Sequence, residues 1–407
     1  FQIRGNLKKE FDSGSITVYG QYIDDQAQFY LPFPLNGGSR SRARGNDGDR
    51  VFSVQTSQVD GMGFNTPAGP FRSSIGDGVI TKDGSLGVAF ENDFGDGWGL
   101  NGKARYASYD HSFDFFLDGD GVVNAPETQA AFLANTSTVR GLPPGSTGVF
   151  TYADTGETLA ANALLFPNRF IDRDRPADDM SIELNLTRSL TLGSFEHSFT
   201  LGAFYADAQA KDFNVTTAYL ADFQNEARLV KLTVTSGRTQ TVFSRNGLFN
   251  AGVGYVNNEH EVQRQAIYLA DQMESDKFIF DIGARFEQVD GDIRREIPGN
   301  FVTDTSPGIS QGLRDVQWGT GQFRVASVDT NEWAVALGAL YKLTDTVNLY
   351  GNAARGFFFP EMRAVVLDAT NRPQTYTAEI IQQAEFGVKY AGDRLWGTLS
   401  ALYTELD

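Results

Sequence analysis

The chain of 407 residues has no cysteine, only three histidines and no long run of apolar residues. Without cysteine there is no disulfide framework and no thiolate metal site. Each histidine stands alone in its segment, without the paired spacing of a zinc site; they are His111, His197 and His260. No stretch reaches the roughly 18 apolar residues that a membrane-spanning helix needs. These absences exclude a disulfide-stapled domain, the common zinc centres and a helical membrane protein.

Basic residues are also scarce, with 34 Lys and Arg against 51 Asp and Glu and a formal net charge of −17. A surface that binds phosphate backbones needs clustered Lys and Arg, so we expect no nucleic-acid partner. Many of the acidic residues crowd into long polar stretches, as Asp114 and Asp118 do. A solvated, mutually repulsive exterior explains them.

What the chain has is strict alternation of polarity in several segments. In residues 180–190 the even positions are mostly apolar and the odd positions polar, and residues 277–287 and 332–342 repeat the pattern. Side chains on a strand alternate with period two, so each segment predicts a strand with one apolar and one polar face.

The connections between these segments are sorted by length. Tight turns are expected at residues 11–14, 95–97, 191–194, 273–276, 344–345 and 392–393, and long polar stretches at 25–84, 110–179, 208–259, 291–331 and 357–377. A two-sheet sandwich also alternates in polarity, but it does not sort its connections. Short periplasmic turns and long extracellular loops are typical of an antiparallel transmembrane β-barrel of the outer-membrane type. The predicted fold class is therefore all-β, with six hairpins and about twelve strands.

The strand pattern fills the whole chain, from residue 1 to residue 407, with no composition shift that marks a domain boundary. We therefore expect one partial transmembrane barrel domain over residues 1–407. Because neither end shows a sign of closure, the chain is expected to be an internal piece of a longer barrel.

Several motifs resemble those of TonB-dependent outer-membrane receptors. The segment 348–360 (NLYGNAARGFFFP) is similar to the strand that ends in Gly-Phe and a Pro opening an outer loop. The segment 384–389 (AEFGVK) resembles the family's Tyr-Glu-Leu-Gly-Val-Lys strand, and 281–287 (DIGARFE) its Asp-x-Gly-x-Arg-Tyr-Glu strand. The resemblance is specific in the last third of the chain and loose elsewhere.

The resemblance implies a barrel of about 22 strands around a plug domain, of which this chain holds the middle portion without plug or closing strands. It implies an importer of a scarce, bulky nutrient rather than an enzyme, with a ferric siderophore favoured and an oligosaccharide second. Its partners would be outer-membrane lipid, its own plug domain, the inner-membrane TonB complex and the ligand. A wet lumen wall is expected from the polar strand faces, with Asn101, Lys103, Arg105, Glu183, Asn185, Asp281, Arg285, Glu287, Glu385 and Lys389.

Two other classes stay open on the sequence: a passive outer-membrane porin, and a soluble all-β binding protein. Long structureless loops are uncommon in compact soluble domains, which disfavours the second. Enzyme motifs are weak. The segment Gly308 to Gly312 matches the nucleophile elbow of hydrolases, but that elbow needs a preceding strand and a following helix, which this loop does not predict.

Exposed apolar groups on outer loops often contact ligands. The candidate ligand-binding residues are aromatic clusters, together with two arginines of the kind that cradles bulky ligands in the family: Tyr30, Phe33, Arg105, Phe113, Phe115, Phe116, Phe357, Phe358, Phe359 and Arg363. No other cofactor is expected beyond a structural Ca²⁺. Its candidate ligands follow part of the EF-hand spacing around Gly121 and are Asp118, Asp120, Asn124 and Glu127.

Overall fold

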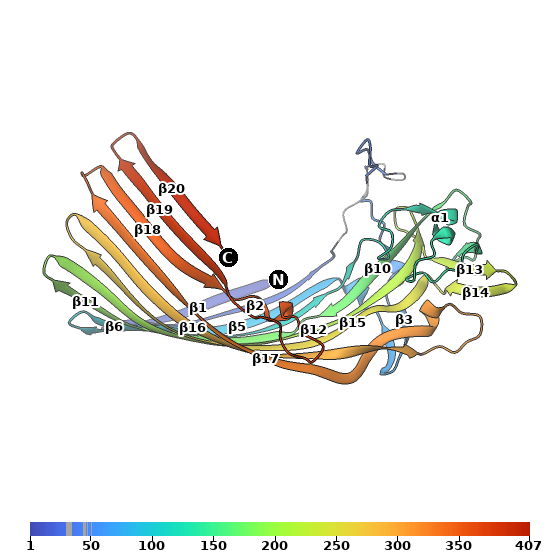
Figure 1. The fold of residues 1–407 in the computed structure, drawn as a ribbon, viewed down its shortest axis with the longest axis horizontal. Coiled ribbons are helices and arrows are strands. Elements are labelled where there is room, and N and C mark those ends of the chain that lie inside the picture. The colour runs from blue at the N-terminus through green and yellow to red at the C-terminus, as the bar shows by residue number, and fades with distance from the viewer. Residues whose placement is uncertain (30–34, 44–45, 47, 50) are drawn as a thin grey trace.

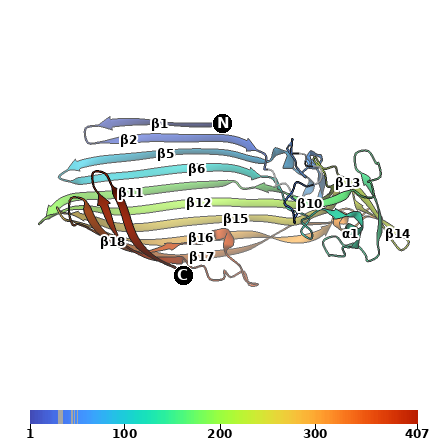
Figure 2. The same cartoon turned by 90° about the horizontal axis from the view of Figure 1, so that it is seen from above.

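The computed structural model describes residues 1–29, 35–43, 46, 48–49 and 51–407. Its main feature is one antiparallel sheet in which the long strands lie in chain order. Figures 1 and 2 show this sheet curled across its width into a trough, with β1 along one edge and β20 along the other. No helix in the described part of the chain is long and apolar enough to cross a membrane.

Within the described residues the long strands form six hairpins. They are β1 (Gln2–Phe11) with β2 (Gly14–Ala27), β5 (Val79–Gly95) with β6 (Trp98–Phe113), β11 (Ala177–Leu192) with β12 (Phe195–Asp222), β15 (Leu248–Glu274) with β16 (Phe278–Val302), β17 (Asp315–Lys342) with β18 (Val347–Phe358), and β19 (Glu379–Ala391) with β20 (Trp396–Leu406). The predicted fold class and all six tight turns are confirmed.

The smaller elements belong to the connections at the other end of the sheet. They are η1 (Ser57–Val59), β3 (Gly63–Thr66), β4 (Gly69–Arg72), η2 (Ile75–Asp77), β7 (Phe115–Phe116), β8 (Glu127–Thr128), α1 (Gln129–Ala134), β9 (Thr147–Tyr152), β10 (Leu164–Asp174), β13 (Val230–Ser236), β14 (Thr239–Ser244), α2 (Gln311–Arg314) and η3 (Met362–Ala364). β10 continues the line of β11 and, like it, pairs with β12.

The turn between β5 and β6 shows why these connections are tight. Gly95, Asp96 and Gly97 have φ values of 83°, 52° and 78°. A Cβ on Gly97 would also lie 2.1 Å from the carbonyl oxygen of Ser189 on the neighbouring hairpin. Positive φ and close backbone approach both favour glycine, so the sequence closes the hairpin without a longer loop.

The strand register places the polar residues on one face, because residues directly opposite one another in adjacent strands share a face. Lys103 lies opposite Glu183, Tyr268 opposite Arg285, and Asn352 opposite Glu385. Following the register from β6 to β19 puts all ten predicted lumen residues on this same face, which is the concave face of the trough.

The opposite, convex face carries exposed apolar side chains near the turns, including Leu86, Val88, Met180, Ile182, Leu184, Leu201, Ile267, Leu269, Ile282, Phe286, Trp333 and Leu337. Farther from the turns the same face becomes acidic, with Asp178, Asp207, Glu261, Asp290, Asp292 and Asp329. We call the first zone the apolar band. An apolar belt facing outward and a polar face inward is the arrangement of a transmembrane barrel wall.

Several of the predicted long loops are wrong in extent; the stretch 110–179, for example, contains β10 of the main sheet. The stretch 208–259 contains the outer parts of β12 and β15, and the stretch 291–331 contains the outer parts of β16 and β17. Above the apolar band neither face meets lipid, so the alternation of polarity fades although the backbone ladder continues. The connection between β16 and β17 shrinks to residues 303–314.

Connecting segments pack on both faces at this outer end of the sheet. On the concave side α1, β9, β13 and β14 form a module around a buried apolar cluster that includes Phe132, Leu165 and Leu232. On the convex side the segment with η1 and η2 is held by a second cluster around Phe170 and Tyr219. Figure 1 shows the two on opposite sides of the sheet.

Candidate functional site

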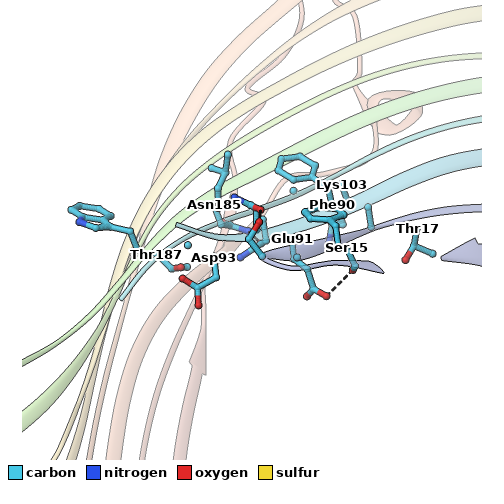
Figure 3. Close-up of a pocket in the computed structure, with 18 of the residues that line it drawn as sticks. Ser15, Thr17, Phe90, Glu91, Asp93, Lys103, Asn185 and Thr187 are labelled. Carbon is cyan, nitrogen blue, oxygen red and sulfur yellow. Dashed lines mark hydrogen bonds between the residues drawn. The ribbon is translucent and has the colours of Figure 1, made fainter. Parts of the chain in front are cut away.

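A polar hollow of about 870 Å³ lies on the concave face near the tight turns, lined by β1, β2, β5, β6 and β11. Figure 3 shows its side chains converging from these strands, with Ser15 joined to Glu91. The Ser15 hydroxyl donates to Glu91 Oε1 at 2.8 Å, and Lys103 Nζ lies 2.8 Å from Glu183 Oε2. The hollow is therefore polar and lined by both acidic and basic side chains, and these side chains are already paired with one another.

The pairing continues across the middle of the wall. Tyr268 donates its hydroxyl to Glu183 at 2.6 Å. Glu287, only 1% exposed, accepts from two guanidinium groups, with its Oε2 2.6 Å from Arg285 and its Oε1 bonded to Arg264. A buried carboxylate stays ionised only when it is paired with a cation, and here the guanidinium groups of Arg285 and Arg264 both pair with Glu287.

The far side of the wall repeats this chemistry on β18 and β19. Tyr350 donates its hydroxyl to Glu385 at 2.6 Å, Asn352 donates to the same carboxylate at 3.2 Å, and Lys389 lies 4.7 Å from the Tyr350 ring centre. Within the described ranges, no group of three or more His, Cys, Asp or Glu residues is arranged to hold a metal ion. The wall is suited to hydrogen-bonding a polar surface.

Tyrosine rings cover glycines on this wall, a packing pattern that the sequence did not predict. Three inward tyrosines lie across glycines of neighbouring strands: a Cβ on Gly202 would lie 2.1 Å from the Tyr268 ring, and Gly87 and Gly387 stand in the same relation to Tyr19 and Tyr350, at 2.4 and 2.6 Å. An aromatic ring that covers a cross-strand glycine stabilises a weak point of the ladder. Only the register pairs these residues, and one sequence does not give the register.

The outer rim of the concave face carries the aromatic cluster predicted at residues 113–116. Phe29 joins this cluster, and Phe116 does not belong to it. The rings of Phe113 and Phe115 are 4.7 Å apart, and Phe29 joins them at 5.8 and 6.0 Å. Phe116 turns the other way and is only 4% exposed, in the cluster with Phe170. Phe29, 42% exposed, is the member that the sequence did not single out.

The aromatic run at the end of β18 is split between the two faces. By register Phe358 points to the concave side and is 62% exposed, whereas Phe357 points to the convex side and packs its ring 5.0 Å from Phe359. Phe358 is thus the residue of this run that is placed to meet a ligand inside the trough.

The remaining candidates fall into two groups. Arg105 is held on the wall by Asp179 at 3.2 Å and Tyr109 at 2.8 Å, and Arg363 is exposed on the segment after β18, paired with Glu361. Tyr30 and Phe33 lie outside the described residues.

The predicted calcium loop has a different geometry from a cation cage. Arg140, with its side chain fully buried, donates to Asp120 at 2.9 Å and to Glu127 at 2.6 Å. Asp120 also accepts the backbone N–H groups of Val122 and Val123 at 3.0 Å. The guanidinium thus occupies two of the expected ligands, Asp118 and Asn124 form no part of this ion pair, and the calcium ion stays a prediction.

A continuous wall with an apolar belt outside and a paired polar face inside defines the class of the protein as a β-barrel of the outer-membrane type. The chain matches the family described as TonB dependent receptor-like, beta-barrel over residues 4–407. It therefore belongs to the TonB-dependent receptors, which are transporters rather than enzymes and whose barrels lie in the outer membrane of Gram-negative bacteria.

Solved structures show the same fold at low sequence identity. The ferric-catecholate import receptor Fiu from E. coli K12, in its open and closed forms, matches with TM-scores of 0.54 and 0.58 at 13% identity, covering 100% of this chain and 52% and 51% of Fiu. The ferric preacinetobactin receptor BauA from Acinetobacter baumannii matches with a TM-score of 0.51 at 13% identity, covering 98% of this chain and 46% of BauA. The chain spans about half the length of these receptors. Among curated proteins no match was found.

Proposed function

We propose that this chain is the central barrel wall of a receptor that imports a ferric siderophore across the outer membrane. The observation that carries the proposal is the concave face, where charged and hydrogen-bonding groups are paired with one another along its length. Such a surface can release one set of hydrogen bonds and form another with a plug domain, at little net cost. A porin lumen is also polar, so it is the family match that favours a plugged receptor over a porin.

The aromatic side chains at the outer rim supply the second half of the proposal. Phe29, Phe113, Phe115 and Phe358 present apolar surface beside polar strand ends, which suits a bulky ligand with aromatic groups. Fiu and BauA, two solved structures with this fold, are named for ferric-catecholate and ferric preacinetobactin. An oligosaccharide would also stack on aromatic rings and is the second candidate ligand.

The test is iron uptake by the full-length protein in its native membrane. Cells carrying the intact gene, and a matched deletion strain, are supplied with a radiolabelled ferric tris-catecholate complex under iron limitation. We expect uptake only with the gene, and loss of uptake when an uncoupler removes the inner-membrane proton gradient. Energy-independent uptake, together with steady ion conductance of the purified protein in planar bilayers, would establish the porin instead.

A further inference from the structure

The connection between β18 and β19 is folded onto the concave face rather than out into solvent. We call residues 359–377 the strap; it is the dark red segment beyond the end of β18 in Figure 1. Met362 and Val365 are each 6% exposed and pack with Ile293 and Val328 of the wall. Tyr376 donates its hydroxyl to the carbonyl of Pro360 at 2.8 Å, which ties the two ends of the strap together.

One arginine of the wall holds the strap by its backbone. Arg295 donates from Nη1 to the carbonyl of Val365 at 2.7 Å, and from Nη2 to the carbonyls of Arg363 at 3.1 Å and Met362 at 3.3 Å. Its Nε is buried without a hydrogen-bond partner. In the part of the chain that the structure describes, no carboxylate lies within 4.0 Å of this guanidinium.

Two further side chains, one arginine and one histidine, stand beside Arg295 on the same face. Arg324 is directly opposite it in the ladder between β16 and β17. His260, two residues from the position paired with Arg295 on β15, has a buried Nε2 without a partner. Burial, and then the charge of Arg295, lower the pKa of His260, and burial lowers the pKa of Arg295 itself. The strap therefore covers one partly desolvated guanidinium, that of Arg295, with the exposed side chain of Arg324 and the half-buried imidazole of His260 beside it.

A guanidinium binds carboxylate, catecholate or phosphate oxygens more strongly than neutral carbonyls, because the hydrogen bonds are charge-assisted and often bidentate. We propose that the strap occupies an anion-binding site centred on Arg295, with Arg324 and His260 beside it, and that an anionic ligand displaces the strap. The ligand class, a negatively charged iron chelate, rests on the proposed function. The strap is then a lid that opens when the anionic ligand replaces the strap carbonyls as hydrogen-bond acceptors of Arg295.

The test measures how fast single cysteines placed in the strap react with a thiol reagent in the full-length receptor. Any cysteine outside these 407 residues is first replaced. Val365→Cys places a thiol on the buried side of the strap, and Val366→Cys places one on its exposed side, where Val366 is 55% exposed. Labelling by an impermeant maleimide on whole cells, without ligand, should be at least about tenfold slower at position 365. Loss of charged hydrogen bonds in Arg295→Gln should raise that rate about tenfold or more.

Controls are available on neighbouring positions. Arg294→Gln removes an arginine from the convex face, where it pairs with Glu259 at 2.7 Å, and should leave both labelling rates unchanged. Met362→Cys gives a second buried reporter in case Val365→Cys loosens the strap by itself. Equal rates at positions 365 and 366 in wild-type background, repeated with the second reporter, would overturn the proposal, as would an Arg295→Gln variant that labels like the parent.

The ligand arm compares two iron chelates of similar bulk, a triply negative ferric tris-catecholate and a neutral ferric tris-hydroxamate. Only the anionic chelate should accelerate labelling at position 365, and Arg295→Gln should abolish that acceleration. Acceleration by both chelates, or by neither, rejects the anion site even where iron uptake is normal. Absent iron uptake rejects the proposed function alone, because the comparison of Arg295→Gln with its parent needs no ligand.

Discussion

At the scale of single residues, buried charge is concentrated in the segments that stand above the apolar band. Arg140, Asp120 and Glu127 form a triad in the concave-side module, and Asp172 and Asp114 form a carboxylate pair under the convex-side segment. The triad lies within the single connection between β7 and β9 and holds that segment together, whereas Asp172 and Asp114 bind Ser74, 98 and 40 residues away, and so attach the convex-side segment to the wall.

Replacement of Arg140 by Ala should locally unfold the concave-side module. The change leaves the buried carboxylate of Asp120 without its cation, and breaking a buried ion pair in this way costs about 3–5 kcal/mol. The check is hydrogen exchange of the α1 and β9 amides, which should lose protection. The control is Arg238→Ala, at the exposed tip between β13 and β14. This variant should change the free energy of local unfolding of the module by less than about 0.5 kcal/mol. Equal effects of the two variants would contradict the assignment.

Asp172 should make attachment of the convex-side segment depend on pH. It accepts from the Ser73 hydroxyl and the Ser74 amide, and burial raises the pKa of Asp172 from 3.8 to about 7. The attached state therefore binds more protons than the detached state between these values. Attachment should be strongest below about pH 4, weaken as the pH rises toward 7, and change little above that.

The measurement is intrinsic-rate-corrected hydrogen exchange of the η2 amides between pH 4.5 and 8. Asp172→Asn keeps an acceptor oxygen but cannot ionise, so it should flatten most of the pH dependence. The neighbouring Asp114, whose pKa burial also raises, accounts for what remains. Asp77→Asn, on the exposed side of the segment, should leave the profile intact. An unchanged profile in Asp172→Asn would refute this role.

At the scale of elements, the sequence was sufficient for hairpins and insufficient for strand length. Residues at positive φ mark two of the six tight turns, at Gly95 to Gly97 and at Gly193, and alternation marks each strand where lipid lies on one side and water on the other. Outside the apolar band that contrast disappears, so β16 and β17 continue beyond Asp290 and Asp329 without a signal. Likewise, Phe116 could not be told from Phe115, because only the packing shows which ring is buried.

The apolar band itself can be tested on β16. Ile282, 46% exposed and midway between Phe278 and Phe286, should tolerate Arg poorly, at a cost of about 2–4 kcal/mol in the membrane-folded state. Asp292→Arg, on the same convex face but above the band, is the matched control and should cost little. Refolding of both full-length variants into lipid vesicles in urea gives the comparison. Equal stability would place the membrane elsewhere on the wall.

At the scale of the whole molecule, the sorting of connections predicts which end faces outward. Arg238→Cys, at the tip of the concave-side module, should react with an impermeant thiol reagent on intact cells. Asp276→Cys, in the tight turn between β15 and β16, should react only after the outer membrane is permeabilised. The reverse pattern would invert the orientation. The sequence predicted this polarity from loop lengths alone, but it could not place the strap or Arg295, because their contacts depend on how a loop folds back onto distant strands.

The height of the wall has an electrostatic consequence. β12 continues from Tyr205, at the edge of the apolar band, to Asp222; at about 3.3 Å per residue and a tilt of about 45°, this raises the rim roughly 40 Å above the lipid. Charges are screened over about 8 Å at physiological ionic strength. A ligand arriving at the rim is thus insulated from the phosphate groups of the membrane surface. Its long-range attraction or repulsion is decided by the receptor's own outer charges, and the salt dependence of capture should report on those charges alone.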